Sequence, residues 1–363
     1  MDIGVPRERR SYDSRVGLTP AGVESLTSEG HTCYVELGAG LGAGFSDHDY
    51  ERAGARIVYS GEEVYGRAEM VIKVARPMVE EFELLQEGQI ITGFMSLAAA
   101  RRDKVESLLE KRVTAIAYET VENDNGSLPI LVSMSQIAGR MCPHVAAALL
   151  QNDRGGKGVM LGGVPGVPAA DVVILGAGKV GTNAARGFFG AGARVIVLDH
   201  DLENLYRIDE MFGGQVTTMV SHAFNIRRVV TFADVLVGAV LVPGARTPTL
   251  VTREMVATIR PRSLIMDLSI DQGGCVETSR PTTHGTPTYI AENVIHYCVP
   301  NITGVVGRTA THALNNAAYP FIHQIVQLGL DGALAANPAL ARGVATRNGE
   351  IVNAALAEAM RVA

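Results

Sequence analysis

Residues 171–181 read DVVILGAGKVG, and residues 194–199 read RVIVLD. The first stretch is a short apolar run followed by three glycines in a G-x-G-x-x-G pattern, which is typical of a strand, a tight turn and the start of a helix. The second stretch is another apolar run, and it ends in an acidic residue. Strand, glycine turn, helix and strand in this order predict a βαβ unit of a parallel sheet.

The same stretch predicts a dinucleotide site. Its glycines would let a pyrophosphate approach the backbone N–H groups at the start of the helix. Asp199 lies 23 residues after Gly176, at the end of the next strand. A carboxylate there can accept hydrogen bonds from the ribose diol and would repel a 2′-phosphate, so we predict NAD(H) rather than NADP. The candidate residues of the turn itself are Gly176, Gly178, Lys179, Val180 and Gly181.

Composition narrows the class of protein. The chain has 363 residues, enough for two domains of about 150 residues, and 47% are hydrophobic. A net charge of −6 without a basic block argues against nucleic acid. No apolar run approaches the length of a membrane span, and the N-terminus is unlike a signal peptide. The cysteines show no metal-ligand spacing, so we predict no metal site and a reducing cytoplasm; they are Cys33, Cys142, Cys275 and Cys298.

Apolar runs alternate with helical patterns along most of the chain. We therefore expect an α/β protein with two doubly wound, Rossmann-like domains joined by long helices. Residues 1–128 plus 308–363 would form a substrate domain, and residues 129–307 the NAD-binding domain. Expected strands include 32–37, 56–59, 70–75, 89–94, 113–118, 171–175, 194–199, 215–220, 235–240 and 263–269; expected helices include 20–28, 62–68, 79–86, 100–110, 135–151, 179–189, 309–330 and 350–361.

A second glycine run, residues 38–44 (GAGLGAG), also follows an expected strand. It lacks an acid about 20 residues later, where Val58, Tyr59 and Ser60 stand instead. We therefore interpret these glycines as a structural turn rather than a second cofactor site.

Several blocks spread over the whole chain resemble the alanine dehydrogenase / transhydrogenase N-terminal-domain family. They are residues 3–8 (IGVPRE), 15–20 (RVGLTP), 134–140 (MSQIAGR), 161–167 (LGGVPGV), 237–245 (VGAVLVPGA) and 270–278 (IDQGGCVET). The resemblance is greater to the alanine dehydrogenases, which oxidise an amino acid to an oxo acid and ammonia and pass hydride to NAD.

The resemblance implies roles for individual residues. Arg15 matches the family's carboxylate-binding arginine, and its planar fork suits that task. Asp271 matches an aspartate beside the nicotinamide, and Asn301 an asparagine of a substrate loop. The resemblance also implies a homo-oligomer, a hexamer in this family. Further matches to cofactor-contacting positions are Ser135, Asp199, Ser221, Val240, Leu241 and Arg280.

Two positions depart from the family. Its K-V-K-E-P segment carries a catalytic lysine at the second Lys, and here residues 73–77 read KVARP, which puts Ala75 at that position. Its F-T-Y-L-H-L-A segment reads TGFMSLA here, over residues 92–98, with Ser96 at the catalytic histidine. Lys73 matches only the first lysine of its segment. Arg76 could replace the missing cation, but strand alternation predicts that it points to the other face.

These departures remove a group that would polarise a keto oxygen and the side chain that titrates near neutral pH. We therefore expect reduction of a preformed C=N bond, in an imine or hydrazone with a carboxylate. One alternative is an amino-acid dehydrogenase for alanine or another L-amino acid, and a second is a non-catalytic NAD-binding regulator. The candidate catalytic residues are Asp271 and Ser96, and the candidate substrate-binding residues are Arg15, Lys73, Arg76 and Asn301. Glu119 could lie behind Ser96, although a solvent-exposed acid at a strand end is the more ordinary reading.

Overall fold

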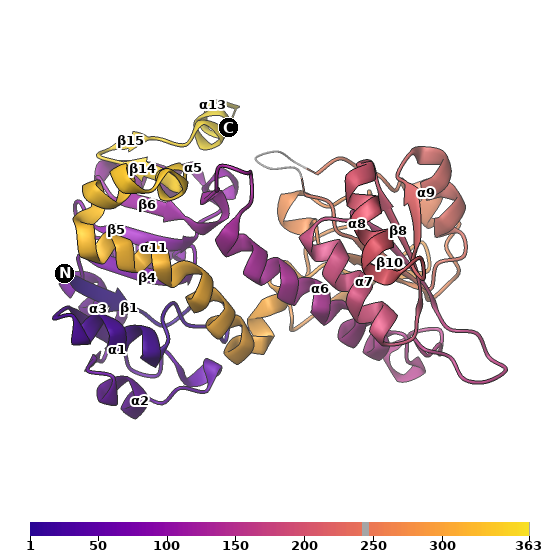
Figure 1. Cartoon of the computed structure of the whole chain (residues 1–363), viewed down its shortest axis with the longest axis horizontal. Helices are drawn as coiled ribbons and strands as arrows, with labels where there is room; N and C mark the ends of the chain where they lie inside the picture. Colours follow the sequence, from indigo (N-terminus) through magenta and orange to yellow (C-terminus); the bar gives the residue numbers. More distant parts are fainter. Residues whose placement is uncertain (242–246, 363) are drawn as a thin grey trace. The chain divides into compact units, whose positions relative to one another are not determined.

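The computed structural model describes residues 1–241 and 247–362. The chain forms two compact units, Met1–Met134 with Thr303–Ala363, and Ser135–Ile302 (Figure 1). Helix α6 (Pro129–Leu149) carries the chain from the first unit into the second. The expected borders of independently folding domains, after residues 128 and 307, stay predictions. The part of the 237–245 block from residue 242 onward lies outside the described residues.

The first unit is built on a sheet in the order β15-β14-β6-β5-β4-β1-β2-β3. Strands β1 to β6 are parallel, whereas β14 runs antiparallel to both β6 and β15. The order of the strands reverses at β1 and β4, and ligands of such sheets bind at the carboxyl ends beside this reversal. The strands are β1 (Asp2–Val5), β2 (Thr32–Glu36), β3 (Arg56–Val58), β4 (Met70–Ala75), β5 (Ile90–Phe94), β6 (Thr114–Ala117), β14 (Val344–Arg347) and β15 (Glu350–Ile351).

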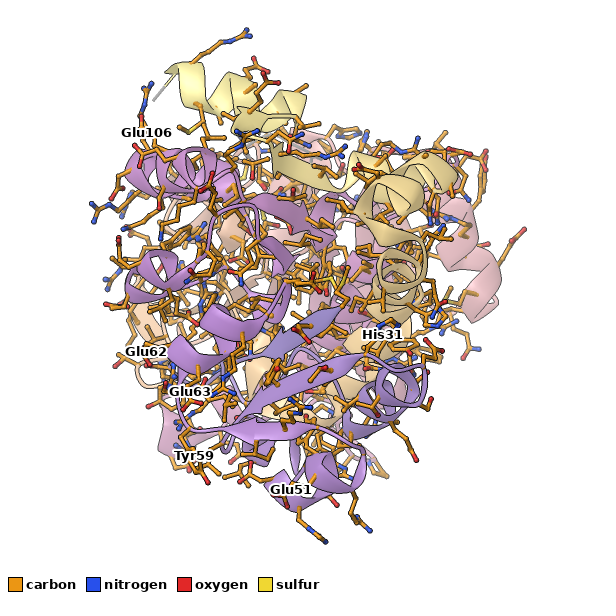
Figure 2. The ribbon with its side chains drawn as sticks, turned by 90° about the vertical axis from the view of Figure 1, so that its left-hand side faces the viewer. His31, Glu51, Tyr59, Glu62, Glu63 and Glu106 are labelled. Carbon is orange, nitrogen blue, oxygen red and sulfur yellow. The ribbon has the colours of Figure 1, made fainter. Side chains whose placement is uncertain are left out.

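The helices of this unit form because apolar side chains recur on one face. On α5 (Arg102–Glu110), Val105 and Leu108 are buried, and Glu106 is exposed. On α3 (Gly61–Arg67), Val64 and Tyr65 are buried, whereas Glu62 is exposed and lies near the left-hand margin of the molecule in Figure 2. The other helices are α1 (Pro20–Ser28), α2 (Asp47–Arg52), α4 (Val79–Leu84), α11 (Gly307–Ala336), α12 (Pro338–Arg342) and α13 (Ala354–Val362).

The second unit is built on a sheet in the order β12-β13-β11-β10-β7-β8-β9. All its neighbouring strands are parallel except β12, which forms an antiparallel pair with β13. The strands are β7 (Asp171–Leu175), β8 (Arg194–Asp199), β9 (Thr217–Val220), β10 (Val235–Gly238), β11 (Leu264–Asp267), β12 (Thr288–Ala291) and β13 (Val294–Tyr297).

Helices cover both faces of this second sheet. Alternate residues of the strands point to opposite faces, so Val172 belongs to one hydrophobic cluster and Val173 to another. The first cluster includes Phe188 of α7 (Lys179–Gly190), and the second includes Ile226 of α9 (Ala223–Val230). The remaining helices are α8 (Leu202–Phe212) and the short α10 (Arg253–Val256).

The predicted fold class is confirmed: both units are doubly wound, with the same order in their six parallel strands. The expected helix over residues 350–361 is wrong at its start, because Glu350–Ile351 pairs with β14 and the helix begins at Ala354. In the part of the chain that the structure describes, none of the helices is long and apolar enough to span a membrane.

Candidate functional site

The glycine turn of the second unit joins β7 to α7 at the carboxyl end of the sheet. Gly176 has a φ of 101°, and a Cβ there would lie 2.4 Å from the carbonyl oxygen of Ala239. A Cβ on Gly181 would lie 1.8 Å from the carbonyl oxygen of Gly176, so this glycine allows α7 to pack against the turn. Gly178 is different, because a Cβ there would meet no atom within 4 Å. Its exposed backbone at the start of α7 is therefore open to a ligand.

Asp199 ties the end of β8 to this turn. The residue is buried, with 6% of its surface exposed. One carboxylate oxygen accepts the N–H of Ala177 at 2.6 Å, and the other accepts the N–H of Asp201 at 2.9 Å. The acid predicted to contact the ribose thus lies against the turn predicted to hold the pyrophosphate. This juxtaposition, with the open backbone of Gly178, fits a dinucleotide.

Other expected cofactor residues lie at the same edge of the sheet. Ser221 follows β9, and its N–H donates to the carbonyl oxygen of Asp199 at 2.9 Å. Val240 follows β10 and donates its N–H to the Ser269 hydroxyl at 3.0 Å, and the neighbouring Leu241 is exposed. Arg280 instead stacks over the ring of Tyr289, at 4.2 Å from the ring centroid. Ser135 is the first residue of this unit, in α6, and Lys179 and Val180 begin α7.

The loop that carries Asp271 is shaped by a residue that the sequence did not reveal. Asp267 ends β11 and is fully buried. Its carboxylate accepts the backbone N–H groups of Ser269, Cys275 and Val276 at 2.9–3.1 Å. Burial raises the pKa of Asp267, although these hydrogen bonds act in the opposite direction. Asp271 itself is exposed. It lies on the short turn Ile270–Gln272, and Asp267 binds N–H groups before and after this turn. Asn301, near the end of this unit, accepts a hydrogen bond from His284 on its carbonyl oxygen.

In the first unit, Arg15 lies in the segment after β1 and is 6% exposed. Its Nε and Nη2 donate to the two carboxylate oxygens of Asp13 at 2.7 and 2.6 Å. Its Nη1 donates to the hydroxyl of Thr303 at 3.1 Å and lies 3.6 Å from the sulfur of Met134. The guanidinium is therefore held in one orientation, as binding a carboxylate requires.

Lys73 is fully buried in β4 and is held by two acids. Its Nζ lies 2.8 Å from Glu81 and 3.4 Å from Glu8. Burial opposes the charged ammonium, but the two carboxylates outweigh this effect and raise the pKa of Lys73. These contacts support a structural role for Lys73, and its expected binding of substrate stays a prediction.

A β-bulge precedes Ala75. Ile72 pairs with Thr92, but the next pair joins Ala75 to Phe94, so β4 has one residue more than β5 between the pairs. Glu8 accepts the N–H groups of Val74 and Ala75, at 2.6 and 3.4 Å. Bulges break the simple alternation of a strand. The side of the sheet expected for Arg76 from alternation alone is consequently unreliable.

Arg76 and Glu119 hold the turn at Ser96 from two sides. Glu119 accepts the N–H groups of Ser96 and Met95 at 2.5 and 3.1 Å, and Arg76 donates to the carbonyl oxygen of Ser96 at 2.6 Å. Burial raises the pKa of the Glu119 carboxyl. The prediction that Glu119 is a solvent-exposed acid is wrong. The residue is partly buried, and its carboxylate accepts backbone N–H groups that follow the end of β5. Ser96 itself is exposed, and its φ of 42° lies in the left-handed region.

Two family models match adjacent parts of the chain. The model described as "Alanine dehydrogenase/PNT, N-terminal domain" matches residues 4–138, and the one described as "Alanine dehydrogenase/PNT, C-terminal domain" matches residues 142–354. Together these ranges include both glycine runs, Arg15 and the loop of Asp271.

Individual proteins match over nearly the full length. The alanine dehydrogenase of Methanococcus maripaludis is 49% identical over 360 residues, covering 99% of this chain and 96% of that protein. The alanine dehydrogenase of Bacillus subtilis is 47% identical over 358 residues, covering 98% of this chain and 94% of that protein.

Solved structures agree with these matches. An L-alanine dehydrogenase superposes with a TM-score of 0.95 at 46% identity, covering 100% of this chain and 99% of that chain. A transhydrogenase from Sinorhizobium meliloti shares the fold, with a TM-score of 0.82 at 22% identity, covering 98% of this chain and 100% of that chain. The motifs, the fold and the full-length identity lead to one conclusion: the chain belongs to the alanine dehydrogenase/PNT family.

Proposed function

We propose that this chain is an amino-acid dehydrogenase, which oxidises the carbon–nitrogen bond of a small carboxylate-bearing amino acid with NAD and also catalyses the reverse reaction. The relatives named alanine dehydrogenase are NAD-dependent oxidoreductases acting on a carbon–nitrogen bond, and so is this chain. The observation that carries the proposal is the 49% identity to an alanine dehydrogenase across 99% of the chain. The rigidly held guanidinium of Arg15 supports it.

In the proposed reaction, Arg15 binds the substrate carboxylate through a charge-assisted contact, while Asp13 keeps its contact with the guanidinium. NAD, held by the glycine turn 176–181 and by Asp199, would supply the acceptor for the hydride of the substrate carbon. The substrate nitrogen loses a proton as the C=N bond forms, and water then converts the imine into an oxo acid and ammonia. Asp271 is the proposed proton acceptor, since its loop is fixed by Asp267. The turn at Ser96 contributes a hydroxyl that can donate to or accept from the substrate.

The test is NAD reduction by the full-length chain with a panel of L-amino acids that includes alanine. We expect turnover with at least one amino acid and a loss of kcat/KM of about ten- to a hundredfold for Arg15→Gln, since a hydrogen bond to a charged group contributes about 1.5–3 kcal/mol. Exposed Arg102 provides the control, as Arg102→Gln should leave the rate unchanged. Absence of NAD reduction with every amino acid would overturn the proposal.

A second candidate is the reduction of a preformed C=N bond. Ala75 and Ser96 favour it, because hydride transfer to an existing imine needs neither a polarised keto oxygen nor activated water. A cyclic imino acid with a carboxylate tests it directly. NADH oxidation with the cyclic imine but not with pyruvate and ammonium would favour this candidate. Oxidation with pyruvate and ammonium at a comparable rate would remove it. Tight NADH binding without oxidation in any mixture would instead indicate the non-catalytic regulator.

A further inference from the structure

A cavity of about 510 Å³ opens in the first unit, beside the carboxyl ends of β1 and β2. One wall is the segment Arg7–Arg15, and the other is part of the second glycine run. A Cβ on Gly42 would lie 2.8 Å from the Ser14 backbone, so this glycine brings the walls together. The volume falls in the range of pockets for small molecules, about 300–1,000 Å³.

The charges along the cavity do not balance. Its two acids are already neutralised, since Glu8 lies against Lys73 and Asp13 forms the bidentate pair with Arg15. Among its cations, Arg9 forms an ion pair with Glu36. Within residues 1–241 and 247–362, no hydrogen bond or ion pair is made by the side chains of the two remaining cations, the exposed Arg7 and Arg10.

These two arginines lie near the parts of the first unit assigned to substrate. Arg15 lines the same cavity. The positive charge of Arg10 also acts on Arg76, whose pKa is lowered mainly by burial and further by this neighbour. Arg76 in turn holds the turn at Ser96. Arg10 is therefore close to the segment in which the sequence departs from its family.

We propose that Arg7 and Arg10 bind a second anionic group of the substrate, a carboxylate or a phosphate-type group, so that the substrate is a dianion anchored by its α-carboxylate at Arg15. This inference rests on the proposed function for the position of the α-carboxylate. Two guanidinium groups without acidic partners favour an anion electrostatically. A cavity larger than a short aliphatic amino acid requires leaves space for the longer side chain.

Binding of unreactive acids to the full-length chain tests the proposal separately from turnover. Glutarate has two carboxylates, 3-phosphonopropionate has a carboxylate and a phosphonate, and butyrate has one carboxylate; none can exchange hydride. We expect titration calorimetry to show that at least one of the two dianions binds at least about tenfold more tightly than butyrate, as one charge-assisted contact would give. The tighter dianion identifies the preferred second group.

Arg7→Gln combined with Arg10→Gln should remove this preference, whereas Arg102→Gln on the exposed face of α5 should preserve it. Equal affinity for butyrate and both dianions, or an equal loss in the Arg102→Gln control, would overturn the inference. Binding is measured without reaction. A chain that prefers dianions but oxidises no amino acid would therefore contradict the proposed function and not the second-anion site. Turnover of alanine without any preference for dianions would contradict the second-anion site and not the proposed function.

Discussion

The turn at Ser96 shows how one carboxylate can fix the backbone of a substrate segment. Ser96 has a φ of 42°, an uncommon conformation for a residue other than glycine. Glu119 accepts two N–H groups of this turn, and Arg76 binds a carbonyl oxygen of the same turn. The conformation is thus maintained from outside the turn, and the side chain at position 96 is left exposed.

Glu119 should make the stability of the protein depend on pH. Burial raises the pKa of Glu119 in the folded chain above its value in the unfolded chain. The folded state then binds the proton more tightly, so this contribution to stability is complete below the unfolded pKa and is lost as the pH rises through the folded pKa. Glu119→Gln should lack this decline in urea unfolding measured from acidic to neutral pH. Glu106→Gln, on an exposed helix face, serves as the control, and parallel curves for wild type and Glu119→Gln would contradict the assignment.

Restoring the two family residues tests the consequence of their loss. Ala75→Lys together with Ser96→His should raise the rate with NADH, pyruvate and ammonium by about 10²–10⁴, the usual contribution of a general acid or base. Histidine tolerates the left-handed backbone at position 96 better than most residues. The measurement is NADH absorbance under saturating substrate. An unchanged rate in a variant with an unchanged melting temperature would contradict the assigned roles of these positions.

The position of a single residue can be predicted from the sequence where the residue belongs to a motif. Asp199 is predictable because strand, turn, helix and acid follow one another within about 30 residues. Asp267 and the role of Glu119 have no such signal, since their partners are backbone N–H groups that any sequence provides. The burial of Lys73 is equally hidden, because its acids Glu8 and Glu81 come from different elements.

At the scale of elements, different glycines of the turn between β7 and α7 serve packing and ligand binding. Gly181→Ala should lower the free energy of unfolding by about 1–3 kcal/mol or more, because the added methyl overlaps the Gly176 carbonyl and must displace α7. Gly178→Ala should leave unfolding nearly unchanged, since its φ is −67° and the space around it is open. It should weaken NADH binding at least about tenfold by blocking close approach of the pyrophosphate. Equal effects of both variants on stability would refute this division of roles.

The loop after β11 should depend on Asp267 as a positioning residue. Asp267→Asn replaces one acceptor oxygen by a donor that faces backbone N–H groups, so we expect a loss of about 1–3 kcal/mol in unfolding free energy. The fall in kcat should exceed the change in KM, because Asp271 would be displaced without loss of Arg15. Asp153→Asn, at an exposed acid of the same unit, is the control. A normal kcat in a destabilised Asp267→Asn variant would limit Asp267 to a structural role.

Elements could be predicted well where the pattern is local. The strands 70–75, 171–175 and 194–199 and the helix 20–28 have the observed bounds, because each is a clear apolar run or a capped amphipathic segment. The end of the chain was harder. Glu350–Ile351 forms a strand only because β14 lies beside it, and β14 itself pairs with a strand more than 200 residues earlier. Such pairing is invisible in a local pattern.

At the scale of the molecule, the two sheets share one order in their six parallel strands, and the predicted cofactor residues belong to the unit built on the second sheet. NADH at 100 times its Kd should raise the free energy of unfolding by about 2.7 kcal/mol. Hydrogen exchange should show the largest added protection in β7, β8 and α7 of the second unit. Added protection confined to residues 1–134 would contradict the cofactor site. The homo-oligomer implied by family resemblance stays a prediction that a mass measurement in solution can test.

The bulge in β4 has a consequence for how the substrate end can change over time. Glu8 satisfies the N–H groups of Val74 and Ala75, and the buried Lys73 anchors the strand through Glu8 and Glu81. The backbone conformation at position 75 is therefore held by neighbouring residues and does not depend on which side chain stands there. A lineage can exchange lysine for alanine there without rebuilding the strand, so specificity at this position can drift while the architecture persists.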